Sequence, residues 1–562
     1  MGLRAFSRFS PTFVQRVAIM KLQRIEIDAQ QLTRLLDRLE SRQLEPQDYK
    51  LLEAILESWQ YLCSSLEKKN VSVKRLKRLL FGSSSEKTDK LLKDTAKKLS
   101  EAGQTEKNKS PPGEDKKPKR KGHGRNGADS YRAAERVQVP HQSLKVGDDC
   151  TQCGKGKLYE LKPPSRIVVL KGQAPVQATV FECQRLRCSA CGTVFTARTP
   201  EAAGAAKYDA TAGSIVALLK YGNGMPFYRL EQLQKSLGIP LAASVQWRLV
   251  KQKAHVAEPV WEEFQRGAAQ GEVLKNDDTH VTILQLLEDR SAALDHMDDE
   301  QKSEFAERTG VFTTAILSSG SERHTIALFH SGVKHAGENM DELLKKRDSG
   351  LPAPILMCDA LSRNLPENFK VILANCSAHA RRQFVDLVEA FPAECEYILE
   401  TFKEVYRFDA QAKQMKLSAE ERLAYHQEHS GPLMDEMHEW LPKQFEQRRV
   451  EPNSSMGEAI SYMIKHWKAL TLFLRVAGAP IDNSATERAL KRAILNRKNS
   501  LFYKTLNGAK VGDILMSVIY TCILCKADPF DYLTQIEMHA AKVAVNPQDW
   551  MPWNYQDQLE SS

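Results

Sequence analysis

Acidic residues interrupt or end apolar segments at three places in the chain. Asp277 and Asp278 lie inside a strand-like run, Asp359 ends a second apolar run, and Glu487 lies in a helix-like segment. Mg²⁺ binds carboxylate oxygens, and two such ions about 3.5–4 Å apart can activate the attacking oxygen of a phosphodiester and stabilise the leaving one. The pattern therefore predicts metal-dependent phosphodiester chemistry with Mg²⁺ or Mn²⁺. Its expected ligands are Asp277 or Asp278, together with Asp359 and Glu487.

Two of these positions have alternative interpretations. Neighbouring strand residues point to opposite faces of a sheet, so only one of Asp277 and Asp278 can face the site. Glu487 follows Asp482, a residue able to cap a helix, and lies where the helix dipole favours an anion. Taken alone, Glu487 would form a surface ion pair with Lys491, four residues later. The two upstream acids favour its interpretation as a metal ligand.

The segments that carry these acids follow a definite order. Apolar runs predict three strands, a helix, a fourth strand that ends on Asp359, and a fifth strand. A mixed sheet whose first and fourth strands each present an aspartate is the pattern of a ribonuclease H-like core. The stretch 385–475 predicts a large helical insertion before the helix of Glu487. The expected core elements are 273–284, 311–317, 325–329, 340–346, 354–359 and 370–375.

Two Cys-x2-Cys pairs, each followed by a glycine, predict a metal site upstream of the core. Four thiolates form the tetrahedral set that a structural Zn²⁺ requires. Strands expected at 166–170 and 177–181 fill the long gap between the pairs, and Cys183 is a spare thiol that could replace Cys188. The alternative is four unrelated buried thiols. The expected zinc ligands are Cys150, Cys153, Cys188 and Cys191.

A heptad pattern near the start of the chain predicts self-association. Apolar residues recur every seven positions from Leu52 to Leu80, and most intervening positions of the seam are also apolar. Lys69 interrupts the seam once. This pattern predicts a short coiled coil and hence a homo-oligomer. The alternative is an amphipathic hairpin that packs on its own chain.

Two further segments carry positive charge that could meet phosphate. Residues 88–130 are basic and rich in Pro, Gly and Ser, which predicts a disordered linker that either contacts phosphates or is a solvated tether. A helix ending at Gly238 and a second helix beginning near Leu241 have helix-turn-helix spacing. The alternative is an ordinary helical hairpin. Only Arg248, Lys251 and Lys253 of the second helix could reach phosphate.

Composition limits the class of protein. The 562 residues carry 80 Lys and Arg against 71 Asp and Glu, a net charge of +9, and 42% are hydrophobic. This balance predicts a folded chain of several domains. The longest apolar run, 514–525, is too short to cross a bilayer and predicts a buried helix.

The 11 cysteines indicate a reducing compartment. The arginine-containing start resembles a transit peptide but is interpreted as an extended start, with Met20 an alternative initiator.

Seven motifs, in the same order along nearly the whole chain, resemble segments of the insertion-sequence-66 family of bacterial DDE transposases. The resemblance implies Asp277, Asp359 and Glu487 as metal ligands, because Asp277 matches the first position of the family's Asp-Glu-Thr motif. Asp278 stands in place of the family's Glu, and Ser484 in place of its second Asn. Asp359 lacks the usual Asp-Gly-Tyr context. Besides the cysteine pairs, the matching segments are 80–87, 277–279, 376–384, 482–488, 497–502 and 551–555.

The resemblance also implies a reaction and its DNA contacts. Water would cut a phosphodiester at each element end, and the freed 3′-hydroxyl would attack target DNA. Cys376 and His379 make an incomplete zinc pair and are expected to pack or to orient the adjacent strand end. The residues expected to contact DNA are Arg381, Arg382, Arg488, Lys491, Arg492, Arg497 and Lys498.

Residues and resemblance together predict a multidomain α+β protein. Its ribonuclease H-like core carries the helical insertion and is preceded by a coiled-coil N-terminus and a zinc-ribbon-like domain. Expected partners are double-stranded DNA of the terminal repeats and target, a second copy, and accessory proteins of the element, in a bacterial cytoplasm at the nucleoid. No membrane partner is expected. The rivals are a degenerate transposase-derived DNA-binding protein and a zinc-ribbon scaffold. The expected regions are 1–87 (helical), 88–130 (linker), 131–200 (zinc-ribbon-like), 201–270 (helix-turn-helix-like), 271–384 (core), 385–475 (insertion), 476–535 (catalytic helix and core completion) and 536–562 (C-terminal segment).

Overall fold

The computed structural model describes most of the chain from residue 206 onward and short stretches before it. Described residues fall into two compact units, of which the larger holds the stretches described up to residue 52, 206–231 and everything described from 241 onward. The smaller unit holds the stretches between 145 and 200, together with 232–240. The described residues are 35, 38–39, 41, 44–52, 145–148, 157, 159, 173–187, 194–198, 200, 206–295, 310–320 and 323–560.

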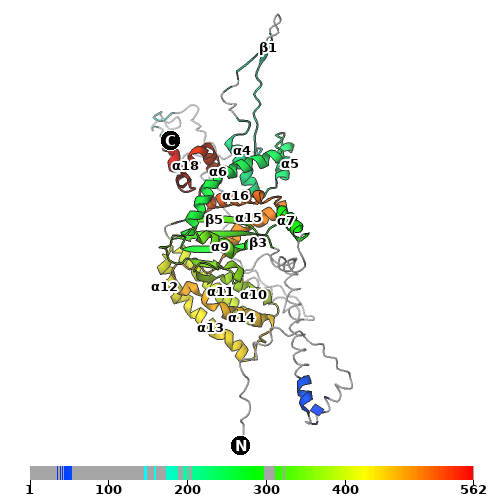
Figure 1. Cartoon of the computed structure of the whole chain (residues 1–562). Helices are drawn as coiled ribbons and strands as arrows, with labels where there is room; N and C mark the ends of the chain where they lie inside the picture. Colours follow the sequence, from blue (N-terminus) through cyan, green and yellow to red (C-terminus); the bar gives the residue numbers. More distant parts are fainter. Residues whose placement is uncertain are drawn as a thin grey trace, which may run out of the picture. The chain divides into compact units, whose positions relative to one another are not determined.

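A five-stranded mixed sheet forms the centre of the larger unit (Figure 1). The strand order is β5-β4-β3-β6-β7; the β3–β4 and β4–β5 pairs are antiparallel, and the β3–β6 and β6–β7 pairs are parallel. Along the chain the order is β3, helix α7, β4, β5, helix α9, β6 and β7, so the predicted order of strands is present but helix α7 between the first two strands was not predicted. β4 and β6 are buried along most of their length, which explains their continuous apolar runs. The strands are β3 (Val273–His280), β4 (Phe312–Gly320), β5 (Arg323–Gly332), β6 (Ile355–Cys358) and β7 (Ile372–Asn375).

Helix α16 (Leu506–Leu524) covers the edge strand β5 with polar side chains. Asp513, Ser517 and Thr521 accept hydrogen bonds from three alternate backbone N–H groups of β5, at 2.7, 2.9 and 3.1 Å. Four helix residues rise about 6 Å and two strand residues about 6.7 Å, so the two repeats match over this length. An edge strand left uncovered would present unsatisfied backbone groups. The apolar run 514–525 thus forms a buried helix, as predicted from its length and composition.

Asp513 makes the stability of this unit depend on pH. Burial raises the pKa of Asp513 to about 7, against two hydrogen bonds from Ser331 that lower it. The folded state therefore holds a proton that the unfolded carboxyl loses near pH 4, so the stabilisation is lost as pH rises toward 7.

Asp513→Asn should remove this dependence, because an amide retains a neutral hydrogen-bonding group. Between pH 5 and 8, the free energy of unfolding of the wild type should fall by about 2–3 kcal/mol more than that of the variant. Urea denaturation at several pH values measures the difference, and parallel curves for the two proteins would contradict it.

Helices cover both faces of the sheet. Helices α6 (Ala243–Ala269) and α9 (Ala336–Leu344) pack on one face, and α15 (Ser484–Ser500) packs against β3 and β4 on the other. Between α5 and α6, Gly238 has a φ of +79°, which suits glycine and agrees with the predicted turn. The prediction that Lys253 reaches phosphate is wrong. Its side chain is fully buried, donates to the carbonyl oxygens of Ala210 and Leu533, and pairs with Glu537.

The stretch between β7 and α15 is helical and has its own core. Phe384, Phe402, Leu441 and Ile460 come from four different helices and are buried together. Figure 1 shows α11 to α14 lying side by side. This stretch contains the predicted insertion 385–475. Its elements are α10 (Ser377–Leu387), α11 (Pro392–Gln414), α12 (Ala419–His429), α13 (Gly431–Glu446), α14 (Ser455–Leu470) and η7 (Leu472–Leu474).

The remaining elements frame these parts. The segment 536–562 was expected as a C-terminal segment; its described part forms short helices, and Trp553 stacks on Phe264 of α6. Within the described residues, no helix is both long and apolar enough to cross a bilayer. The remaining elements are α4 (Ala210–Ala217), η5 (Leu218–Gly222), α5 (Phe227–Ser236), α7 (Leu284–Asp295), η6 (Ser362–Asn364), α17 (Pro529–Met538), α18 (Ala540–Val545), η8 (Pro547–Trp550) and α19 (Tyr555–Glu560).

In the smaller unit, β1 (Arg185–Arg187) pairs antiparallel with β2 (Val194–Thr196). The strand predicted at 177–181 is absent: those residues are described without regular structure, and Val180 is 82% exposed. An isolated strand needs a pairing partner, and its expected partner at 166–170 lies outside the described residues. The four cysteines predicted to bind zinc, the predicted linker 88–130 and the predicted heptad seam after Leu52 lie outside them as well.

Candidate active site

Asp277 lies in β3, and Asp359 directly follows β6, the parallel neighbour of β3. In the β3–β6 pairing the last aligned residues are Lys275 and Met357, and each aspartate stands two positions further along its strand direction. Adjacent strands are about 4.8 Å apart, so the backbones at these two positions are neighbours. This juxtaposition follows from the sequence pattern of an apolar strand ending on Asp359 beside a strand that contains Asp277.

Strand alternation separates Asp277 from Asp278. The Asp278 side chain is 2% exposed and is held on the α9 side, where Arg363 Nη2 donates to it at 3.2 Å and His335 Nδ1 lies 3.3 Å away. Lys275, on the same face as Asp277, reaches the carbonyl of Asp482 just before α15. Asp278 therefore has a counter-ion of its own in Arg363, and Asp277 faces the α15 side of the sheet.

Glu487 lies in the first turn of α15, on the face that Asp277 occupies. The helix begins at Ser484, and its N-cap is Asn483, not the expected Asp482. Asp482 contributes in a different way, because its Oδ1 accepts a hydrogen bond from Ser484 N at 3.0 Å. The positive end of the helix dipole favours a carboxylate at the position of Glu487.

The acidic groups around Asp277 act on its pKa. Burial, followed by repulsion from Asp359 and by smaller contributions from Asp278 and Glu487, raises the pKa of Asp277 to about 7. A hydrogen bond from the backbone N–H of Asp278 opposes the rise. Because buried carboxylates that repel one another are stabilised by a shared cation, this arrangement suits a divalent metal.

A chain of buried asparagines ties together the three segments that carry the carboxylates. Asn483 Nδ2 donates to the backbone carbonyl of Asn276 at 2.8 Å, and Asn276 Nδ2 donates to that of Asn364 at 2.8 Å. Asn364 Nδ2 in turn donates to Asp359 Oδ1. All three asparagines are at most 1% exposed. Sequence reasoning missed this chain, although an asparagine inside an apolar strand, as at position 276, is a readable signal.

A tyrosine of the helical stretch also reaches the site. The Tyr462 side chain of α14 lies near the backbone N–H of Ala360, next to Asp359. Burial, with the charge of Asp359 adding to it, raises the pKa of Tyr462 to about 12. Its ring lies 4.8 Å from that of His466. No motif surrounds Tyr462, so the sequence contained no signal for its position.

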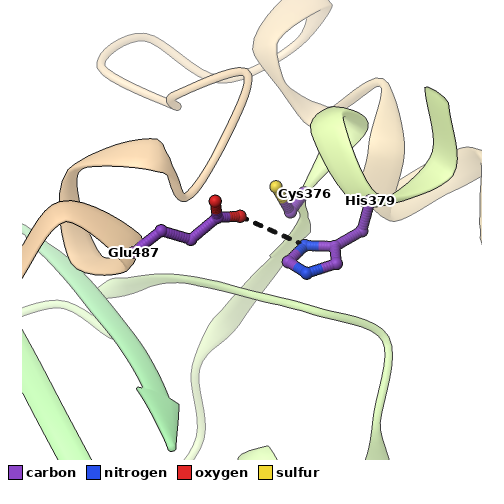
Figure 2. A group of neighbouring side chains, drawn as sticks. All are labelled: Cys376, His379 and Glu487. Carbon is purple, nitrogen blue, oxygen red and sulfur yellow. Dashed lines mark ion pairs between the residues drawn. The ribbon is translucent and has the colours of Figure 1, made fainter. Parts of the chain in front are cut away.

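Cys376, His379 and Glu487 form the tightest group of potential metal ligands in the part of the chain that the structure describes (Figure 2). One ligand atom from each lies within 4.8 Å of the others. His379 Nδ1 is 3.7 Å from Glu487 Oε1. Among the described residues, Asp277, Asp359 and Glu487 do not form so close a group. Glu487 therefore belongs to the predicted carboxylate site and also lies beside Cys376 and His379. Those two residues were expected to pack or to orient the adjacent strand end.

The basic residues predicted to contact DNA fall into two kinds. Arg488, Lys491 and Lys498 are exposed along α15. Arg492 instead lies 4.8 Å over the Tyr520 ring and donates to the carbonyl of Gly222, which argues against the predicted phosphate contact.

Three other arginines that were predicted to contact DNA are partly engaged by other groups of the protein. Arg497 donates to Thr279 Oγ1 at 3.1 Å and to the carbonyl of His280, so it fastens α15 to the end of β3. Arg381 and Arg382 are half-buried on α10.

Comparisons with known proteins identify the family of the chain. A model of the transposase IS66 family matches residues 207–511, more than half of the chain. The chain is 27% identical over 439 residues to the uncharacterized protein y4hP of Sinorhizobium fredii, covering 72% of this chain and 73% of that protein. It is 30% identical over 187 residues to the uncharacterized protein y4jD of the same organism, covering 33% of this chain and 36% of that protein.

Proposed function

Because the chain belongs to the IS66 family of transposases, we propose that it binds the ends of a mobile element and catalyses metal-dependent DNA cleavage and strand transfer there. Family membership supports a transposase role. The observation that supports the chemistry is the position of Asp277 in β3 and of Asp359 directly after its parallel neighbour β6, with Glu487 in the first turn of a helix over the same face. The order and directions of the five strands support a ribonuclease H-like core.

Asp277, Asp359 and Glu487 fit a hard divalent cation, and they would hold Mg²⁺ or Mn²⁺. All three donors are oxygens, as these ions prefer. The raised pKa of Asp277 reflects burial and, after it, the negative charge of its neighbours, both of which a bound cation would offset, and Glu487 Oε1 is buried without a hydrogen-bond donor. When bound, such ions activate the attacking oxygen of a phosphodiester and stabilise the leaving one.

The chain's own residues would orient this site and the DNA. Asn364 fixes the carboxylate of Asp359, while the other buried asparagines hold β3 and α15 in register with it. The exposed side chains of Arg488, Lys491 and Lys498 would contact phosphates beside Glu487. These contacts would position the scissile phosphodiester and carry no sequence information themselves.

The upstream regions complete the proposal. Cys150, Cys153, Cys188 and Cys191 would bind one structural Zn²⁺, and the heptad seam would join copies of the chain. The DNA partners would be the terminal repeats and the target. Accessory proteins of the same element would join the complex.

Strand cleavage of terminal-repeat DNA tests the proposed activity. The full chain should cut labelled end DNA in Mg²⁺ or Mn²⁺, leave a free 3′-hydroxyl, and stop cutting in EDTA. A scrambled duplex of the same length and composition is the matched control. Cleavage that persists in EDTA would contradict the metal requirement. Binding of end DNA with no cleavage in either metal would favour the degenerate DNA-binding protein.

A further inference from the structure

Two elements bring a thiol, an imidazole and a carboxylate to one point. Cys376 is the N-cap of α10, His379 lies in its first turn, and Glu487 lies in the first turn of α15. Figure 2 shows the three side chains converging, with a dashed line between His379 and Glu487. The convergence links residues more than a hundred positions apart, and hydrogen bonds between the start of α10 and the residues just before α15 hold it.

The atoms that face one another here lack hydrogen bonds. His379 Nδ1 and Glu487 Oε1 are both buried without a hydrogen-bond partner. Their separation of 3.7 Å is too long for a hydrogen bond. Two ligands of one tetrahedral zinc ion are about 3.4 Å apart. The observed distance is therefore closer to the spacing of two ligands of one ion than to the length of a hydrogen bond.

The sulfur is also placed to act as a ligand. Cys376 is fully buried, and its Sγ accepts a hydrogen bond from Asn483 N at 3.2 Å. Burial raises the pKa of the Cys376 thiol to about 11, against the hydrogen bond from Asn483 that lowers it, so a bound cation would have to displace the thiol proton. A set of thiolate, imidazole and carboxylate suits Zn²⁺ and similar ions, whereas Mg²⁺ selects oxygen ligands alone.

We propose that Cys376, His379 and Glu487 form a second cation site, one that takes a borderline-soft transition metal such as Zn²⁺. Binding would displace the thiol proton of Cys376 to solvent and use the neutral imidazole of His379 through Nδ1. Three protein ligands leave a fourth position for water. The site is separate from the four-cysteine site proposed upstream.

The shared carboxylate gives this site a regulatory consequence, which rests on the proposed function. Glu487 is also assigned to the Mg²⁺ site. An ion held by Cys376 and His379 would draw Glu487 away from Asp277 and Asp359. Zn²⁺ would then inhibit Mg²⁺-dependent cleavage by competing for this one ligand.

Co²⁺ titration of the full, reduced chain tests the site without reference to activity. The wild type should bind about one more Co²⁺ than Cys376→Ser or His379→Asn. The difference spectrum between wild type and Cys376→Ser should contain a thiolate-to-cobalt charge-transfer band, because the four upstream cysteines are common to both. Cys395→Ser, which removes another fully buried thiol, is the matched control and should bind as the wild type does. If circular dichroism reveals a folding defect in Cys376→Ser, His379→Asn decides. Equal Co²⁺ uptake and a flat difference spectrum would overturn the proposal.

Zn²⁺ inhibition at fixed Mg²⁺ tests the shared ligand. Relative to each protein's own rate without Zn²⁺, half-inhibition of Cys376→Ser should need at least about tenfold more Zn²⁺ than that of the wild type. Equal sensitivity would overturn the competition. A wild type that binds the additional Co²⁺ but never cleaves would contradict the proposed function and leave the metal site standing.

Discussion

Asp277→Asn, Asp359→Asn and Glu487→Gln should each reduce Mg²⁺-dependent cleavage of end DNA by about 10³-fold or more. Each substitution retains the shape of the side chain and removes one charged ligand from a shared site. DNA binding should persist, because it depends on Lys and Arg contacts to phosphate. Quantitative cleavage assays beside gel-shift titrations separate the two effects. A double variant should be no worse than either single, because the ligands act as a unit.

Asp278→Asn is the internal control for this series. Its carboxylate is paired with Arg363 and His335 on the opposite face of β3. The variant should therefore retain most of the cleavage rate. Loss of cleavage in Asp278→Asn but not in Asp277→Asn would shift the assigned ligand by one residue. Cleavage by all four variants would place the active site elsewhere.

Gly337→Ala should damage both stability and cleavage, although Gly337 is not one of the three proposed metal ligands. An added Cβ would overlap the carbonyl oxygen of Leu365 and lie 2.8 Å from that of Arg363. These are backbone atoms of the turn η6 and the residue after it, which cannot move aside as a flexible side chain can. The same turn supplies Asn364 to Asp359 and Arg363 to Asp278.

The expected effects of Gly337→Ala follow from overpacking and misplacement. The free energy of unfolding should fall by about 1–3 kcal/mol. The cleavage rate, measured well below the unfolding temperature, should fall by about 10²-fold because the carboxylates shift. Gly350→Ala is the matched control, since a Cβ there meets open space, and it should change stability by less than about 0.5 kcal/mol. A Gly337→Ala protein with wild-type stability and activity would refute the role assigned to this turn.

The sequence predicted the strands of the sheet and the places of the three acidic residues on their elements, because both depend on local patterns. An apolar run that ends on Asp359 and period-two alternation around Asp277 define strands without reference to distant residues. The position of Glu487 in an early helical turn follows similarly from the polar residues that precede it. One detail differed: Asn483, not Asp482, is the N-cap of α15.

The supporting contacts could not be predicted because their partners are distant in sequence. Asn276 bonds backbone atoms 88 residues away, and accepts at its own carbonyl from a residue 207 away. In the sequence, Ser517 and Thr521 of α16 appeared only as interruptions of an apolar run. In the structure they accept hydrogen bonds from backbone N–H groups of the edge strand β5. Lys253 looked like a surface cation because neither Glu537 nor the receiving carbonyl groups are local in sequence.

Binding of Mn²⁺ detected by electron paramagnetic resonance tests most directly the central claim that three carboxylates hold one divalent-metal site. Free Mn²⁺ gives a strong signal that bound Mn²⁺ lacks, so titrations of wild type and variants report binding without any cleavage. Asp277→Asn, Asp359→Asn and Glu487→Gln should each weaken Mn²⁺ binding by at least about tenfold, while Asp278→Asn should match the wild type. Identical titration curves for the wild type and the three ligand variants would contradict the claim.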